Sequence, residues 1–138
     1  MKEKNHGFSL VELIVVVAIM AVLVGVLAPA YLAYVEKSRI QRDESAAGEI
    51  FRAAEIVVYT GQYDISNTVL VTFDSTGINL NTSLLNNAEI LEILQDHFGN
   101  QYQTAKPVSR KYKNMTYTVT ILPPVGDSLM PQLSASWS

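Results

Sequence analysis

The stretch GFSLVELIVVVAIMAVLVGVLAP, from Gly7 to Pro29, places a single acid, Glu12, at the start of an apolar run. No charged residue occurs from Leu13 to Val35, and this run exceeds the roughly 20 residues that a helix needs to cross a bilayer. A carboxylate costs about 2.5–3.5 kcal/mol at the centre of a membrane helix, and less near its ends. The sequence therefore predicts a membrane-length helix whose acid needs a specific partner.

Three interpretations of this N-terminus are open. A secretory signal peptide would start with the two early lysines and end in the A-x-A-like cleavage site Ala28–Ala30. A plain single-pass anchor would keep the whole segment. A cut between Gly7 and Phe8 would create a cationic α-amine one helical turn before Glu12, and a neighbouring copy would offer the same amine. In that case the acid would set the register between identical helices.

The composition fits one membrane-anchored chain with a modest globular part. The chain has 138 residues, 49% of them hydrophobic, and a formal net charge of −3, which gives no general case for nucleic-acid binding. It has no cysteine, so disulfides, thiol catalysis and cysteine-based zinc sites are excluded.

The segment GFSLVE (Gly7–Glu12), after a short leader with two lysines, resembles the class III prepilin cleavage motif of type IV pilins and pseudopilins. The resemblance reaches about Arg42 and includes YVEKSR (Tyr34–Arg39). It implies that a prepilin peptidase cleaves after Gly7 and N-methylates Phe8, which leaves the amine cationic. It also implies that Glu12 directs assembly.

The resemblance further implies a structural subunit of a type IV pilus-like, homo-oligomeric helical filament. The implied partners are the prepilin peptidase, an assembly platform protein and its ATPase. The precursor would span the cytoplasmic membrane once with its head outside, and the assembled filament would be extracellular. A pseudopilin of a type II secretion or competence (DNA-uptake) system is the alternative within the family. Outside the family, a secreted or anchored binding module remains open. No cofactor or metal is implied.

The helix is expected from Phe8 to Tyr59, with Gly61 as its stop. We expect a kink at Gly25 and Pro29, because proline cannot donate a hydrogen bond to the carbonyl of residue 25. Beyond the membrane, helical spacing places six apolar residues in one stripe: Ala47, Ile50, Phe51, Ala54, Val57 and Val58. The polar faces are expected to carry seven charged residues: Arg39, Arg42, Asp43, Glu44, Glu49, Arg52 and Glu55.

The remaining residues predict three or four antiparallel strands over this stripe. Strands are expected at Val69–Phe73, followed by a turn, at Met115–Ile121 and at Leu133–Trp137, and a helix at Asn87–Phe98 that ends at Gly99. The fold class is α+β, type IV pilin-like, with a long N-terminal helix packed against a small antiparallel sheet. The expected divisions are a leader (1–7), a transmembrane and filament-core helix (8–35), an amphipathic helix (36–60) and a globular head (61–138).

Nothing in the head predicts an enzyme. His97 is the only histidine after the leader, and the acids Asp64, Asp74 and Asp127 are scattered, with no calcium-loop spacing. Phosphate-loop, zinc-protease and nucleophile-elbow motifs are absent from the sequence. The C-terminal stretch also lacks the acidic calcium-binding pattern that major pseudopilins typically carry, which favours a pilin.

One cluster of basic residues stands out: Lys106, Arg110, Lys111 and Lys113. Interleaved with Tyr112 and Tyr117, it suits single-stranded nucleic acid or another anionic surface. The alternative is a solvated strand edge where lysines discourage edge-to-edge pairing. Four aromatic residues would also suit a carbohydrate-binding patch: Tyr102, Tyr112, Tyr117 and Trp137.

Overall fold

The computed structural model describes residues 7–60, 68–81, 92, 95–96, 99, 104–127 and 130–138. Its main elements are α1 (Leu10–Thr60), β1 (Val69–Asp74), β2 (Gly77–Asn81), β3 (Tyr117–Leu122) and β4 (Gln132–Trp137). The chain divides into two compact units, Met1–Glu36 and Lys37–Ser138, and the sheet belongs entirely to the second unit.

Helix α1 starts at Leu10, two residues later than expected, and ends at Thr60, directly before Gly61. Its helical assignment runs without a break through Pro29. A proline inside a helix removes one backbone hydrogen bond and strains the preceding turn, so an uninterrupted assignment is compatible with a bend. The kink at Gly25 and Pro29 therefore stays a prediction.

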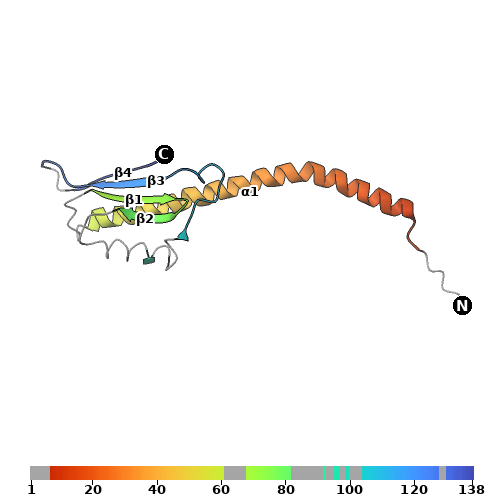
Figure 1. Ribbon diagram of the computed structural model, residues 1–138, viewed down its shortest axis with the longest axis horizontal. Coiled ribbons are helices and arrows are strands. Elements are labelled where there is room, and N and C mark those ends of the chain that lie inside the picture. The colour runs from red at the N-terminus through yellow and green to blue at the C-terminus, as the bar shows by residue number, and fades with distance from the viewer. Residues whose placement is uncertain are drawn as a thin grey trace. The chain divides into compact units, whose positions relative to one another are not determined.

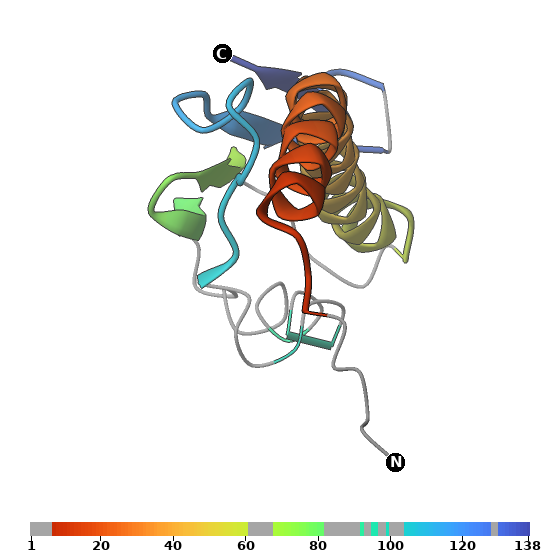
Figure 2. The same cartoon turned by 90° about the vertical axis from the view of Figure 1, so that its right-hand side faces the viewer.

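The four strands form one antiparallel sheet in the order β2-β1-β3-β4. The pairing aligns residues of one face across the sheet, with Val71 opposite Val119 and Val119 opposite Ala135. All four strands lie on the same side of the second half of α1 (Figure 1), and Figure 2 shows the same arrangement from the end of the molecule. The α+β fold of a long helix against a small antiparallel sheet is confirmed.

The core lies between the sheet and the apolar stripe of α1. Five of the six stripe residues are buried, and the sixth, Phe51, packs against the core from a half-buried position. Ala53, outside the expected stripe, is also buried. From the sheet, the core receives Val69, Val71, Phe73, Ile78, Val119 and Ile121. Alternate residues of β1 and β3 thus face the helix, as period-two patterning requires.

Strand β2 is the fourth of the three or four expected strands, but the sequence predicted only a turn after β1 and no strand at this position. In the structure that turn is tight: Asp74 accepts hydrogen bonds from the backbone N–H and the hydroxyl of Thr76, and the hydrogen bond from the Thr76 hydroxyl lowers the pKa of Asp74. Gly77 follows with a φ of 131°, which only glycine adopts readily. The turn returns the chain along β1, so β2 pairs with β1.

The bounds of the other expected elements agree with the structure to different degrees. Strand β3 begins at Tyr117 rather than Met115, because the N–H of Met115 donates to the carbonyl of Tyr112 in the preceding turn. Strand β4 matches the expected last strand to within one residue. The expected helix Asn87–Phe98 falls almost wholly outside the described residues.

Candidate functional site

The expected cleavage and assembly residues lie at the start of α1. Gly7, Phe8 and Ser9 precede the helix, and the side chain of Phe8 is 87% exposed. The N–H of Leu13 donates to the carbonyl of Ser9 at 3.2 Å, which makes Ser9 the N-cap of α1. The peptide bond between Gly7 and Phe8 therefore lies outside the helix.

Glu12 has a local partner that the sequence reasoning missed. The backbone N–H of Ser9 donates to Oε2 of Glu12 at 2.9 Å. This is the return bond of a capping box, in which a glutamate at the third helical position accepts from the N-cap residue. The S-x-x-E spacing before an apolar run could have predicted it. A neutral amide donor leaves the negative charge of Glu12 in place, so pairing with the Phe8 amine stays a prediction.

The first half of α1 presents a continuous apolar surface. Every large apolar side chain from Phe8 to Tyr34 is exposed in the single chain. By length and composition, α1 can cross a membrane, and it is the one such helix in the described part of the chain. Contiguous apolar surface of this extent marks a membrane or protein-interaction site.

Asp43 connects α1 to the segment before β3. Its side chain is 1% exposed. The backbone N–H of Val108 donates to both carboxylate oxygens, at 2.9 and 3.1 Å, and the N–H of Ser109 donates to Oδ2 at 2.8 Å. Hydrogen bonds to an ionised acceptor are stronger than neutral ones, so Asp43 fastens residues 108–109 to the helix.

The expectation that Asp43 lies on a polar, solvated face is wrong. Asp43 precedes Ala47 by four residues and Ile50 by seven, so it continues the apolar stripe by one helical turn. The same periodicity that predicted the stripe therefore places Asp43 on the buried face. The missing information was the pair of backbone donors, which come from residues more than 60 positions away and satisfy the buried carboxylate.

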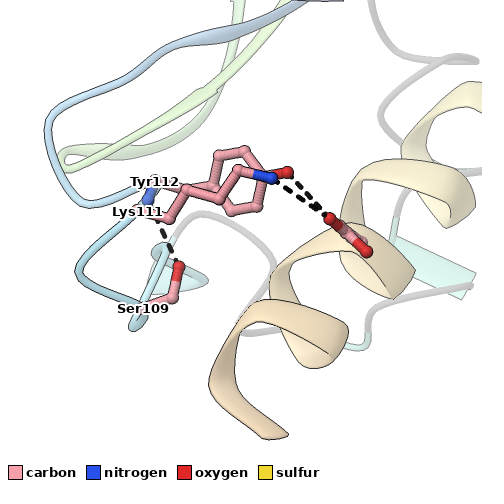
Figure 3. Close-up of polar contacts among 4 residues, drawn as sticks. Ser109, Lys111 and Tyr112 are labelled. Carbon is pink, nitrogen blue, oxygen red and sulfur yellow. Dashed lines mark hydrogen bonds and ion pairs between the residues drawn. The ribbon is translucent and has the colours of Figure 1, made fainter. Parts of the chain in front are cut away.

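A second contact between the same segments involves Glu44. The turn after Ser109 is held by its Oγ, which accepts the N–H of Tyr112 at 3.2 Å. Lys111 and Tyr112 both reach across to the Glu44 carboxylate (Figure 3). The Tyr112 hydroxyl donates to Oε1 at 2.8 Å, and Nζ of Lys111 lies 3.6 Å from the same oxygen.

Lys111 is thus engaged within the chain. Its Nζ lies 4.5 Å from the centre of the Tyr112 ring, within the range of a cation–π contact. A side-chain hydrogen bond with Tyr112 raises the pKa of Lys111, with a smaller contribution from the Glu44 carboxylate. Exposed ion pairs stabilise by little, so the Tyr112 hydroxyl and ring carry more of this contact than the lysine charge does.

The aromatic residues expected to form a carbohydrate patch instead contact one another inside the unit. Tyr112 is 5% exposed and stacks on Trp137 with ring centres 4.1 Å apart. Tyr117 and Phe73 also contact the Trp137 ring, at 5.1 and 6.0 Å, and burial raises the pKa of Tyr117. Tyr102 lies outside the described residues. Because Tyr112 and Trp137 stack on each other, one face of each ring is covered. The two rings therefore do not form an exposed surface on which a sugar could stack.

The anion-binding role expected for the four basic residues stays a prediction. Lys111 contacts Glu44, while Lys106, Arg110 and Lys113 are exposed. Lys113 lines a groove together with Arg39 and Arg42 of α1. One residue of the expected cluster, Lys113, therefore lies beside Arg39 and Arg42, which the sequence analysis had placed only on a polar face of the helix.

Sequence comparisons relate part of this chain to known proteins. A family model described as the prokaryotic N-terminal methylation motif matches residues 2–28. The type IV major fimbrial protein FimA of Dichelobacter nodosus is 37% identical over 62 residues, which are 45% of this chain. A probable minor fimbrial protein of the same organism is 37% identical over 65 residues, or 47% of this chain. A fimbrial protein of Pseudomonas aeruginosa is 31% identical over 85 residues, or 53% of it.

These likenesses are partial. The aligned stretches cover 40% of FimA, 41% of the minor fimbrial protein and 55% of the Pseudomonas protein. No solved structure matches the chain.

Proposed function

We infer that this chain, which belongs to the type IV pilin family, is a structural, non-enzymatic subunit of a type IV pilus-like filament. The observation that carries the inference is the methylation motif over residues 2–28, which includes most of an apolar helix half whose large side chains from Phe8 to Tyr34 are exposed in the single chain. A surface of this kind needs lipid before assembly and sister helices after it. The names of the fimbrial relatives favour a pilin over a pseudopilin.

In this proposal, residues 1–7 are a leader that a prepilin peptidase removes, and Phe8 becomes the methylated N-terminus. Residues 8–35 then serve first as membrane anchor and later as filament core. Residues 36–60 and 61–138 form the head, which the precursor holds outside the cytoplasmic membrane. An assembly platform protein and its ATPase would move subunits from the membrane into an extracellular, homo-oligomeric filament.

Glu12 would direct assembly through its charge. The bond from the Ser9 N–H occupies Oε2 but does not neutralise the carboxylate. An opposite charge is the partner that makes an acid tolerable in an apolar setting. The α-amine of Phe8, from the same or a neighbouring subunit, would supply this charge once the leader is gone, and would set the register between helices.

Two substitutions separate the charge of Glu12 from its capping role. Glu12→Ala removes both, whereas Glu12→Gln keeps an acceptor for the Ser9 N–H and removes only the charge. We expect both variants to insert into the membrane and lose their leader, because removing a charge lowers the cost of insertion. We expect both to yield few or no filaments, measured by shearing cells and quantifying the chain in the filament fraction.

Normal filament yield from Glu12→Gln would show that capping is enough and would remove the charge-pairing role. Normal yield from Glu12→Ala would remove the assembly role of this residue altogether. If the unaltered chain is never found in sheared filaments of its native host, the proposed function itself fails.

A further inference from the structure

A groove with positively charged walls lies within the unit Lys37–Ser138, where α1 meets the segment before β3. We call it the basic groove. It encloses about 560 Å³ and is lined by Ser38, Arg39, Arg42, Pro107, Val108 and Lys113. No acidic residue is among these lining residues.

Three long cationic side chains reach this groove from two separate segments. Arg39 and Arg42 come from successive positions on α1, and Lys113 comes from the turn before β3. All three are exposed. Asp43, the acid directly after Arg42, is buried, and its carboxylate accepts the N–H groups of residues 108 and 109. These hydrogen bonds hold the groove wall formed by Pro107 and Val108 against the helix. The position of this wall is therefore fixed within the unit.

The position of these arginines relative to the apolar run suggests what they meet. Arg39 and Arg42 follow Val35, the last residue of the uncharged run, by four and seven residues. At 1.5 Å per helical residue they lie roughly 6 and 10 Å further along the helix. The polar headgroup layer of a bilayer is about 5–8 Å thick on each side of the hydrocarbon. Arginine and lysine side chains also extend toward that layer from nearby positions.

We propose that the basic groove binds the phosphate of an anionic phospholipid at the outer surface of the cytoplasmic membrane and thereby holds the head against the membrane before assembly. This inference rests on the membrane-anchored precursor of the proposed function. It also gives a role to basic residues just after the span, on the side where the positive-inside rule disfavours them. Clusters of lysine and arginine next to a membrane helix bind anionic headgroups.

Single-stranded nucleic acid is the other polyanion that a basic surface could take. Proteins that bind it combine positive charge with aromatic rings on which bases stack. Tyr112, the ring nearest in sequence to Lys113, is buried and already stacked on Trp137. None of the described residues that line the groove is aromatic. The groove thus offers positive charge next to a membrane-length helix but no aromatic ring for base stacking. This combination favours the phosphate of a lipid headgroup over nucleic acid.

The test uses the full chain in neutral detergent micelles and follows backbone amide signals by NMR. Short-chain phosphatidylglycerol, short-chain phosphatidylcholine, inorganic phosphate and a short single-stranded oligonucleotide are titrated separately. We expect saturable shifts at residues 38–42 and 108–113 with phosphatidylglycerol alone, since it combines net negative charge with a lipid position in the micelle.

Two double variants with the same change of charge provide the comparison. Arg42→Gln with Lys113→Gln removes one cation from each wall of the groove and leaves Arg39 in place. Arg52→Gln with Lys106→Gln removes two exposed cations that do not line it. We expect the groove variant to bind phosphatidylglycerol roughly tenfold more weakly or worse, and the control variant to bind within about twofold of the unaltered chain. Unchanged amide signals elsewhere in the unit confirm that both variants are folded.

Four results would overturn the proposal. Equal shifts with phosphatidylcholine would show that negative charge is irrelevant, and equal shifts with inorganic phosphate would show an anion site with no preference for lipid. Tighter binding of the oligonucleotide at the same residues would assign the groove to nucleic acid. Equal weakening in both variants would reduce the effect to net charge. The titration does not depend on filaments, so loss of lipid binding in a chain that still forms filaments rejects only this inference. Lipid binding by a chain that never forms filaments rejects only the proposed function.

Discussion

Glu12 and Asp43 are both acids of α1 that accept backbone hydrogen bonds, but they have different roles because their surroundings differ. Glu12 is exposed and accepts one N–H at the helix start, whereas Asp43 is 1% exposed and accepts from two residues of a distant segment. A buried N–H that loses its acceptor costs about 1–3 kcal/mol. Asp43 therefore stabilises the head, whereas Glu12 has the assembly role in the proposed function.

Replacing Asp43 should destabilise the unit Lys37–Ser138. We expect Asp43→Ala to lower its free energy of unfolding by about 2–3 kcal/mol, since the N–H groups of residues 108 and 109 lose their acceptor. Asp43→Asn keeps one acceptor oxygen and should cost less, about 1 kcal/mol. The measurement is urea unfolding of the full chain in mild detergent, followed by the fluorescence of Trp137, the only tryptophan.

Glu49→Ala is the matched control, because Glu49 is an exposed acid on the same helix. It should change the free energy of unfolding by less than about 0.5 kcal/mol. If Asp43→Ala and Glu49→Ala unfold at the same urea concentration, the Asp43 contact contributes nothing measurable to the head.

At the scale of elements, the sequence predicted those whose own residues alternate or repeat clearly. Strands β1, β3 and β4 and the apolar stripe of α1 follow from period-two and helical spacing. Strand β2, with sequence GINLN, contains a glycine and two asparagines, which strands generally avoid. It forms because the Asp74–Gly77 turn returns it to β1. Strand β2 therefore depends on its pairing with β1, and a local sequence pattern cannot predict such pairing.

The candidate site shows the same division. The motif around Gly7, Phe8 and Glu12 is contiguous, so it could be recognised directly from the sequence. The basic groove combines Arg39 and Arg42 with Lys113, about 70 residues further along, so only the fold could bring them together. The periodicity of the apolar stripe could have predicted the burial of Asp43. It could not have predicted the N–H groups of residues 108 and 109 that donate to its carboxylate.

Strand β4 is an edge of the sheet, and it is held by its pairing with β3 and by the contacts of Trp137. The Trp137 ring contacts Phe73, Tyr112 and Tyr117. We expect Trp137→Ala to lower the free energy of unfolding by about 2–3 kcal/mol, somewhat less than for a fully buried tryptophan because this side chain is only half-buried. Circular dichroism during urea unfolding measures the loss. Ser136→Ala, on the exposed face of the same strand, should leave the unfolding curve unchanged, and an equal loss in both variants would contradict the role of the aromatic cluster.

At the scale of the whole molecule, one continuous helix serves two environments. Its first half exposes every large apolar side chain, and its second half buries an apolar stripe beneath four strands. The change from one regime to the other occurs where charged residues first appear after Val35. In the proposed function, the first half of the helix would exchange lipid for sister helices while the second half stays folded beneath the sheet.

The intact mass of the chain recovered from sheared filaments tests the pilin assignment most directly. We predict a mature chain that begins at Phe8 and carries one added methyl group, because residues 2–28 match the N-terminal methylation motif and the bond between Gly7 and Phe8 lies ahead of the helix. A signal-peptide cut after Ala30 would leave Tyr31 first and discard Glu12 together with most of the apolar helix half. A plain anchor would keep residues 2–7. A mass that matches a chain starting at Tyr31, or one that still carries the leader, would contradict the pilin assignment and the role of the Phe8 amine as the partner of Glu12.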